Sequence, residues 1–218
     1  FDGKAVGVLQ GKGVVAGLKA NGKYDDTPVV AELNGGPTDN NSKLFKSGYD
    51  SVLNPLYKNG TFKKGPDQWV PGWDNQKART IFEQMLVQTG NRIDAVAAAN
   101  DGLAGAVVSA LKAKKLQPIP LSGQDATPQG VQNIISGWQT MTVWKDTRKL
   151  ATASAQAAIA LLRGGKPKTT GTVPNGGKKL AAFIIPPVSI TKANYKQLFN
   201  GYLKRGEVCR GEFAKFCK

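Results

Sequence analysis

Short runs of apolar and β-branched residues alternate with longer segments of helical periodicity along most of the chain. The short runs predict strands at residues 28–33, 67–70, 93–99, 116–124 and 139–144. The longer segments predict helices at residues 7–19, 40–53, 74–89, 101–113, 127–136 and 147–162. This βαβα order is typical of an α/β fold with a doubly wound parallel sheet and helices on both faces.

The last quarter of the chain departs from this pattern. Residues 164–179 are rich in Gly, Pro, Lys and Thr, a composition typical of an exposed connection. A last strand at residues 180–190 is interrupted by Pro186-Pro187, which favours a crossing or edge strand. A short helix at residues 194–202 and a tail with both cysteines complete the prediction.

The composition removes several classes of chemistry. The 218 residues include no histidine, which excludes a Ser-His-Asp triad and imidazole metal ligands. Two cysteines are too few for a zinc ribbon or an iron–sulfur cluster. We therefore expect no metal and no cofactor. No apolar run approaches the ~18 residues that a bilayer-spanning helix needs.

The net charge of +15 comes from 30 Lys and Arg against 15 Asp and Glu. Only six of the 30 bases are arginine, the residue whose planar fork suits phosphate and base recognition. The lysines are scattered from Lys4 to Lys218. This pattern favours a solvated basic surface and no nucleic-acid partner.

Polar residues gather directly after the predicted strands. They form the segments 34–41, 69–74, 100–101, 123–125 and 144–146. Because the carboxyl ends of parallel strands meet at one edge of a sheet, we expect these segments to surround one crevice. They bring carboxylates, amides, indoles and an ammonium group but no glycine-rich phosphate loop. This set suits a neutral polyhydroxylated ligand, whose hydroxyls both donate and accept and whose C–H face packs on an indole.

Each of these residues also has a structural interpretation. Asp39, Asp74 and Asp101 precede predicted helices, where a carboxylate commonly caps the first backbone N–H groups. Asn100 and Gln124 suit loop or turn positions, and Lys145 suits a solvated surface. For each aspartate taken alone, capping is the better interpretation. The site hypothesis therefore rests on the convergence of these polar residues on one crevice.

Five segments together resemble the xylose-binding branch of the periplasmic monosaccharide-binding proteins of ABC importers. They are TDNNSKLFKSGY (38–49), DQWVPGW (67–73), DAVAAAND (94–101), SGQDATPQG (122–130) and QTMTVWK (139–145). The resemblance implies a non-enzymatic solute-binding protein with two α/β lobes that close around an aldose. It also implies residue roles: Asp39, Asn41, Asn100 and Asp125 on sugar hydroxyls, Trp73 stacked on the ring, and Lys145 approaching from the hinge. Lys46 aligns with an arginine that the family uses against the sugar.

The resemblance also assigns the parts of the chain. Residues 1–142 and 186–218 correspond to the C-terminal lobe, and residues 143–185 to a portion of the N-terminal lobe, most of which would lie outside this chain. We expect export to the periplasm or outer face of the cell membrane, delivery of the sugar to ABC permease subunits, and a monomer when both lobes are present. In an exported protein, two nearby cysteines favour a disulfide between Cys209 and Cys217.

Two alternatives remain at this stage. A sugar-sensing effector domain of a LacI-type regulator shares the fold, but would need a helix-turn-helix that the visible chain lacks. A sugar-active enzyme could use paired carboxylates, but nothing in the sequence marks a proton donor held in an apolar pocket.

Overall fold

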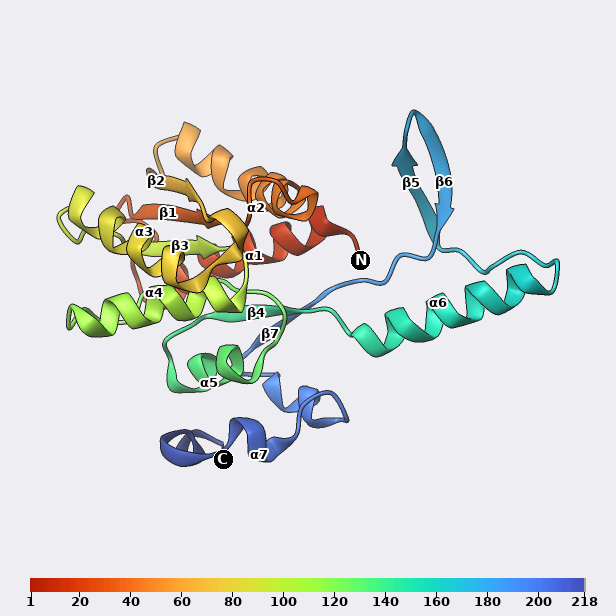
Figure 1. The fold of residues 1–218 in the computed structure, drawn as a ribbon. Helices are drawn as coiled ribbons and strands as arrows, with labels where there is room; N and C mark the ends of the chain where they lie inside the picture. The colour runs from red at the N-terminus through yellow and green to blue at the C-terminus, as the bar shows by residue number, and fades with distance from the viewer. Residues whose placement is uncertain (218) are drawn as a thin grey trace.

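The structure, a computed structural model that describes residues 1–217, has a body in which helices surround a parallel sheet (Figure 1). Its strands are β1 (Val29–Asn34), β2 (Lys63–Trp69) and β3 (Ala95–Ala98), in the order β2–β1–β3. The backbone of Ser122 bonds to β3, and parallel bridges at Leu121 and Gln124 continue the order toward β4 (Met141–Trp144). The predicted α/β fold with a parallel sheet is therefore confirmed.

Helices cover both faces of this sheet. The first face holds α1 (Gly3–Ala20) and α2 (Asn40–Lys58), and the second holds α3 (Asn75–Gln88) and α4 (Asp101–Ala113). Successive side chains of a strand point to opposite faces. Accordingly, Val30 packs with the first helix pair, whereas Ala31 and Leu33 pack with the second.

The region predicted as a strand at residues 116–124 forms only isolated bridges, at Leu121 and Gln124. It carries two prolines, Pro118 and Pro120, which lack the backbone N–H that a ladder requires. After it come α5 (Pro128–Ser136) and β4.

Residues 147–184 form an extension that leaves the body, which we call the arm (Figure 1). It consists of α6 (Thr147–Leu162) and a hairpin of β5 (Gly171–Asn175) and β6 (Lys178–Ala182). No residue of α6 is buried among those described. The predicted exposed connection at residues 164–179 is exposed, but it also contains most of this hairpin, which the sequence did not predict. Its turn is Gly176-Gly177, where both φ angles are positive, at 54° and 79°.

The chain returns to the body through β7 (Val188–Thr191), which pairs antiparallel with β4. The predicted strand at 180–190 is thus two strands separated by the segment with Pro186-Pro187. The predicted helix at 194–202 is a shorter 3₁₀ helix, η2 (Tyr195–Phe199), followed by α7 (Arg205–Val208) and a 3₁₀ turn, η3 (Gly211–Phe216).

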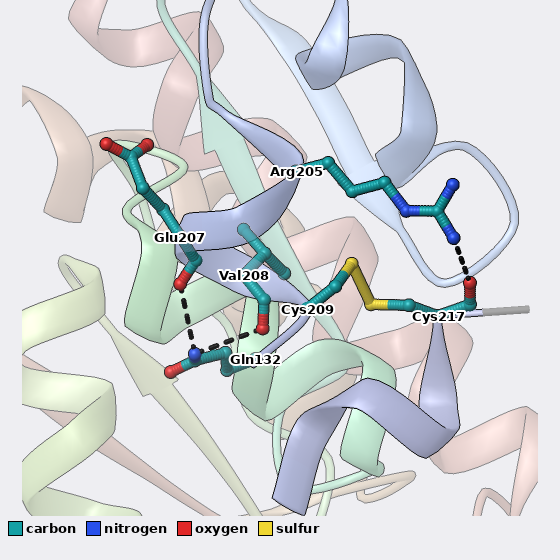
Figure 2. Close-up of a disulfide and its surroundings, with 6 residues drawn as sticks. All are labelled: Gln132, Arg205, Glu207, Val208, Cys209 and Cys217. Atoms are coloured by element: carbon teal, nitrogen blue, oxygen red, sulfur yellow. Dashed lines mark hydrogen bonds between the residues drawn. A yellow bond between two sulfur atoms is a disulfide. The ribbon is translucent and has the colours of Figure 1, made fainter. Parts of the chain in front are cut away.

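The predicted disulfide between Cys209 and Cys217 is confirmed (Figure 2). The Gln132 side chain of α5 donates to the carbonyl oxygens of Glu207 and Val208, at 3.3 and 3.1 Å. Arg205 donates to the Cys217 carbonyl at 3.0 Å. On the chain-entropy model, a loop of this length stabilises the fold by about 2–3 kcal/mol. The disulfide and the Arg205 hydrogen bond close the tail on itself, and the two Gln132 hydrogen bonds hold it against α5.

Among the helices of residues 1–217, none combines the length and apolar character that crossing a membrane requires.

Candidate functional site

A cleft of about 420 Å³ lies at the carboxyl ends of the parallel strands. Six of the seven residues predicted to contact a ligand line this cleft: Asp39, Asn41, Trp73, Asn100, Asp125 and Lys145. They come from five separate loops or helix starts, which the sheet brings together as expected from its topology.

Asp39 and Trp73 form a bonded pair on one side of the cleft. One carboxylate oxygen of Asp39 caps α2 by accepting from the Asn41 backbone N–H at 2.8 Å, and the other accepts from the Trp73 indole N–H at 3.2 Å. Gly35 packs against the indole so closely that a Cβ there would overlap the ring. Trp73 ends the 3₁₀ turn η1 (Pro71–Trp73) with φ at 57°. Capping and site roles are therefore combined in Asp39, and the indole is fixed in place.

Asn100 also caps a helix from the edge of the cleft. Its side-chain oxygen accepts from the Leu103 backbone N–H at 2.9 Å, so Asn100, and not Asp101, is the N-cap of α4. Asp101 is buried instead and accepts from Thr127 and from the Gln139 amide at 2.9–3.1 Å. Burial raises the pKa of Asp101 to about 6, although these donors favour its ionised form. Asp101 thereby ties the loop after β3 to the start of α5.

Asp125 and Lys145 form an ion pair that also lines the cleft. The Lys145 ammonium lies 3.2 Å from an Asp125 carboxylate oxygen and 5.6 Å from the centre of the Phe45 ring. Asp125 has a φ of 99°, and Ala126 follows with 50°. Such conformations cost of order 1–3 kcal/mol each and persist only where neighbours impose them. Here the Asp125 N–H bonds to the Val143 carbonyl, and the Ala126 N–H bonds to the Thr142 hydroxyl.

Lys46, which was also predicted to contact the ligand, is not among the residues that line the cleft. Its ammonium bonds to Glu32 on β1 and Asp67 on β2, and lies 3.4 Å from Asp50. Phe45 faces the cleft, and the next helical position turns by about 100°, which directs Lys46 toward the sheet.

The cluster formed by Lys46 and its carboxylate partners contains groups whose pKa values are strongly shifted. Desolvation raises the pKa of Glu32 to about 7 despite the attraction of Lys46, whereas hydrogen bonds from Lys46, Lys64 and Asn34 outweigh desolvation and lower the pKa of Asp67 to about 2. The attraction of the carboxylates outweighs burial and raises the pKa of Lys46, which stays charged. Its role here is to neutralise buried carboxylates.

Five lining residues were not singled out from the sequence as ligand contacts: Phe1, Gly3, Val6, Phe45 and Gln124. Phe45 could have been found, since it lies one helical turn after Asn41. Gln124 was considered only as a turn residue. Its amide donates to the Ala99 carbonyl at 3.0 Å, and its side-chain oxygen has no hydrogen-bond partner among residues 1–217.

The cleft thus offers two carboxylates, an ammonium group, amides and a fixed indole. Carboxylates accept hydroxyl protons, amide and ammonium N–H groups donate to hydroxyl oxygens, and an indole face covers apolar C–H surface. Within the described residues there is no group of three or more carboxylates or thiolates that could hold a metal ion. The arrangement suits reversible capture of a neutral, hydroxyl-rich small molecule.

Comparisons with known proteins agree with this chemistry. A family described as "Periplasmic binding protein domain" matches residues 1–166. The D-xylose-binding periplasmic protein of Haemophilus influenzae is 39% identical over 198 residues, which are 90% of this chain and 58% of that protein. The D-xylose-binding periplasmic protein of Escherichia coli is 38% identical over 211 residues, which are 95% of this chain and 62% of that protein. The chain therefore spans about 60% of the length of these relatives.

Solved structures give the same result. A carbohydrate transporter solute-binding protein from Chloroflexus aurantiacus, in complex with D-glucose, has a TM-score of 0.82 and 30% identity. An ABC transporter solute-binding protein from Clostridium phytofermentans, with bound β-D-glucose, has a TM-score of 0.83 and 27% identity. Each alignment covers 95% of this chain and 68% of the other.

Proposed function

This chain belongs to the periplasmic binding protein family, and from that membership and the cleft we propose that it captures an aldose monosaccharide for an ABC transporter permease. The ligand would be xylose or a glucose-like sugar, in line with the sugars named for its relatives. The observation that carries the proposal is the convergence of six polar and aromatic side chains on one cleft.

Each lining residue has a role that its geometry permits. Asp39 and Asp125 accept hydroxyl protons, and each such bond to a charged group contributes about 1.5–3 kcal/mol. Asn41, Asn100 and Lys145 donate to hydroxyl oxygens. Trp73 stacks on the C–H face of the ring, and its bond to Asp39 holds the indole in one orientation.

Capture proceeds by closure of two α/β lobes around the sugar. Residues 1–142 and 186–218 form the C-terminal lobe, and residues 143–185 belong to the N-terminal lobe. The paired strands β4 and β7 connect the body to the arm and supply the hinge. The permease recognises the closed form, which the bound sugar favours by its extra contacts. The protein acts as a monomer in the periplasm or at the outer face of the cell membrane. The names of both relatives include the word periplasmic, which supports the first of these two places.

Calorimetric titration tests the proposal. The protein is a two-lobed chimera, in which the part of the E. coli relative without a counterpart in this chain is joined to it. D-Xylose, D-glucose and D-galactose are titrated in turn, and we expect at least one to bind with micromolar affinity or better.

Two tryptophans provide a matched pair of variants. Trp73→Ala should weaken binding at least about tenfold, because it removes the stacking surface. Trp69→Ala, at the end of β2 and outside the cleft, should stay within about twofold. Absence of binding for all three sugars, in a chimera that is folded by circular dichroism, contradicts the proposal.

A further inference from the structure

A buried glutamine interrupts the apolar face of α1. Val6, Gln10, Val14 and Leu18 are spaced four residues apart, so they lie along one face of the helix, and all four are fully buried. The three apolar members of this row pack in the core between α1, α2 and the sheet. An amide at such a position needs hydrogen-bond partners, because a buried polar group without them costs free energy.

The amide nitrogen of Gln10 meets three backbone carbonyl oxygens from two separate segments of the chain. It lies 3.0 Å from the oxygens of Ala98 and Ala99 and 3.3 Å from the oxygen of Gly123. Ala98 ends β3, and Gly123 belongs to the neighbouring segment that bridges to β3 through Leu121. One side chain of α1 therefore joins the carboxyl ends of two adjacent segments of the sheet.

Each of these two segments leads directly into a residue of the cleft. Asn100 follows Ala99, and Asp125 lies two residues after Gly123. Because peptide units are planar, a hydrogen bond that fixes a carbonyl also fixes the direction in which the chain continues. The common donor at Gln10 therefore constrains the separation of Asn100 and Asp125. Gln10 itself is not among the residues that line the cleft.

The three carbonyl oxygens do not need Gln10 to satisfy their hydrogen bonding. Each accepts from a second donor at 3.0 or 3.1 Å, and in chain order these donors are the Ser122 hydroxyl, the Gln124 amide and the Val143 N–H. The side-chain oxygen of Gln10 has no hydrogen-bond partner among residues 1–217, which lowers the net contribution of this amide to stability. The distinctive effect of Gln10 is therefore geometric, since it holds three oxygens around one point.

We propose that Gln10 is a positioning residue for the cleft, an inference that rests on the proposed sugar-binding function. It holds the segments that carry Asn100 and Asp125 at the separation in which both bond to one sugar, without contacting the sugar itself. When the amide is removed, each segment keeps its other hydrogen bonds but can shift relative to its neighbour. The sugar must then order the two segments on binding, and that ordering reduces the affinity.

Calorimetric titration of the two-lobed chimera tests the proposal with a matched pair of variants. Gln10→Met keeps the length of the side chain and removes the amide, and the affinity for the sugar that the chimera binds best should fall at least about tenfold. Gln132→Met is the control. Gln132 is also a buried helical glutamine whose amide donates to two backbone carbonyls, but these lie in the tail and Gln132 does not line the cleft (Figure 2). Its affinity should stay within about twofold.

A double-mutant cycle distinguishes positioning from a general effect on the fold. In a chimera that already carries Asn100→Ala, the addition of Gln10→Met should weaken binding by no more than about threefold, because one of the two positioned contacts is gone. In a chimera that carries Trp73→Ala, the addition should keep its full tenfold effect, since the indole is held by Asp39 and not by Gln10. A residue that only stabilises the fold would give equal losses in the two backgrounds.

A second variant covers the case in which Gln10→Met does not fold by circular dichroism. Gln10→Asn keeps the amide on a side chain one carbon shorter, which cannot reach all three oxygens, and the same loss of affinity is expected. The proposal is overturned by an affinity within about twofold of the unaltered chimera, by equal losses for the Gln10 and Gln132 variants, or by equal losses in the two backgrounds. These results contradict the positioning role alone, whereas an unaltered chimera that binds no sugar contradicts the proposed function and this inference together.

Discussion

Asp125 combines three features that favour a ligand contact over a structural role. Its carboxylate lies in the cleft, its backbone adopts a φ of 99° that neighbouring hydrogen bonds impose, and its charge partner is Lys145. Residues held in such conformations gather at functional sites, where surrounding structure offsets the strain. Asp74 offers a comparison, because it also follows a strand but accepts from the Gln76 and Lys77 backbone N–H groups as an exposed helix cap.

The first prediction compares these two aspartates in the two-lobed chimera. Asp125→Ala removes a charged acceptor and leaves Lys145 without its partner, so the sugar affinity should fall at least about tenfold. Asp74→Ala removes a cap, so the free energy of unfolding should fall by about 0.5–2 kcal/mol with affinity nearly unchanged. Calorimetry and chemical denaturation measure the two effects. Equal affinity losses would show that the cleft is not the binding site.

The second prediction concerns pH. The protein has no histidine, so groups with shifted pKa values dominate its titration between pH 4 and 7.5. Burial raises the pKa of Glu32 to about 7 and of Asp101 to about 6, above their unfolded values. The folded state therefore binds more protons in this window, and the free energy of unfolding should rise by about 1–3 kcal/mol as pH falls from 7.5 to 5.

Below about pH 4 the free energy of unfolding should instead decrease as the pH falls. The pKa of Asp67 is lowered to about 2, so its contribution to stability is lost as pH falls from 4 toward 2. Urea denaturation across pH 3–8 measures the free energy of unfolding in both pH ranges. Glu32→Gln should reduce the rise in the free energy of unfolding between pH 7.5 and 5. Asp26→Asn, at an exposed carboxylate, should leave this rise unchanged. A stability that declines steadily from pH 7.5 to 5 would contradict the prediction.

At the scale of elements, the packing of α1 on α2 shapes one wall of the cleft. The helices meet at Gly7 and Gly48, where a Cβ would overlap the backbone carbonyl of Phe45 or of Lys4. The start of each helix then lines the cleft, through Gly3 and Val6 on α1 and through Asn41 and Phe45 on α2. The helices can approach this closely, and so form this wall, only because Gly7 and Gly48 have no side chains.

The third prediction tests this contact. Gly7→Ala must separate the helices, so the free energy of unfolding should fall by about 1–3 kcal/mol, the usual range for overpacking. Gly206→Ala is the control, because Gly206 lies in α7 with no atom near its missing Cβ. There alanine should be neutral or stabilise by up to about 1 kcal/mol. Thermal denaturation of both variants measures the difference, and equal effects would contradict a close helix contact.

Local signals predicted some elements well and missed others for physical reasons. The bounds of α4 and α6 were predicted to the residue, because Asp101, Thr147 and Gly164 lie at sharp ends of helical periodicity. The hairpin of β5 and β6 was missed because its composition resembles a loop, although Gly176-Gly177 is a recognised hairpin turn. Most of β2 was missed because KKGPDQW has no alternating apolar pattern, and pairing with β1 holds it as an edge strand.

The site was predictable to the extent that topology determines it. Six residues follow strand ends or begin helices, positions that a parallel sheet brings to one edge. Lys46 lies outside this set, because a resemblance gives a position in the sequence but not the direction of a side chain. That direction depends on the buried carboxylate of Glu32 and the half-buried carboxylate of Asp67, which attract the ammonium. No local pattern in α2 indicates this tertiary pairing.

At the scale of the whole molecule, the body and the arm differ in how completely they are packed. The body has buried clusters on both faces of its sheet, whereas α6 buries no residue among those described. On the arm, Leu150, Ile159 and Leu162 are 42%, 48% and 87% exposed. Apolar surface of this kind is normally covered by a partner or by another part of the protein.

The last prediction follows from this incomplete packing and from the open cleft. Pockets for small ligands bury about 70–90% of the ligand surface, and one lobe supplies one wall only. The 218-residue chain alone should therefore bind D-xylose, D-glucose and D-galactose at least ~100-fold more weakly than the two-lobed chimera, a loss of roughly 2.7 kcal/mol. It should also self-associate through the arm, since association covers the apolar face of α6. Calorimetry and light scattering of the purified chain measure both effects, with Leu150→Ser and Ile159→Ser together expected to reduce association. Micromolar sugar binding by a monomeric chain would show that a single lobe suffices and that the two-lobe mechanism is wrong.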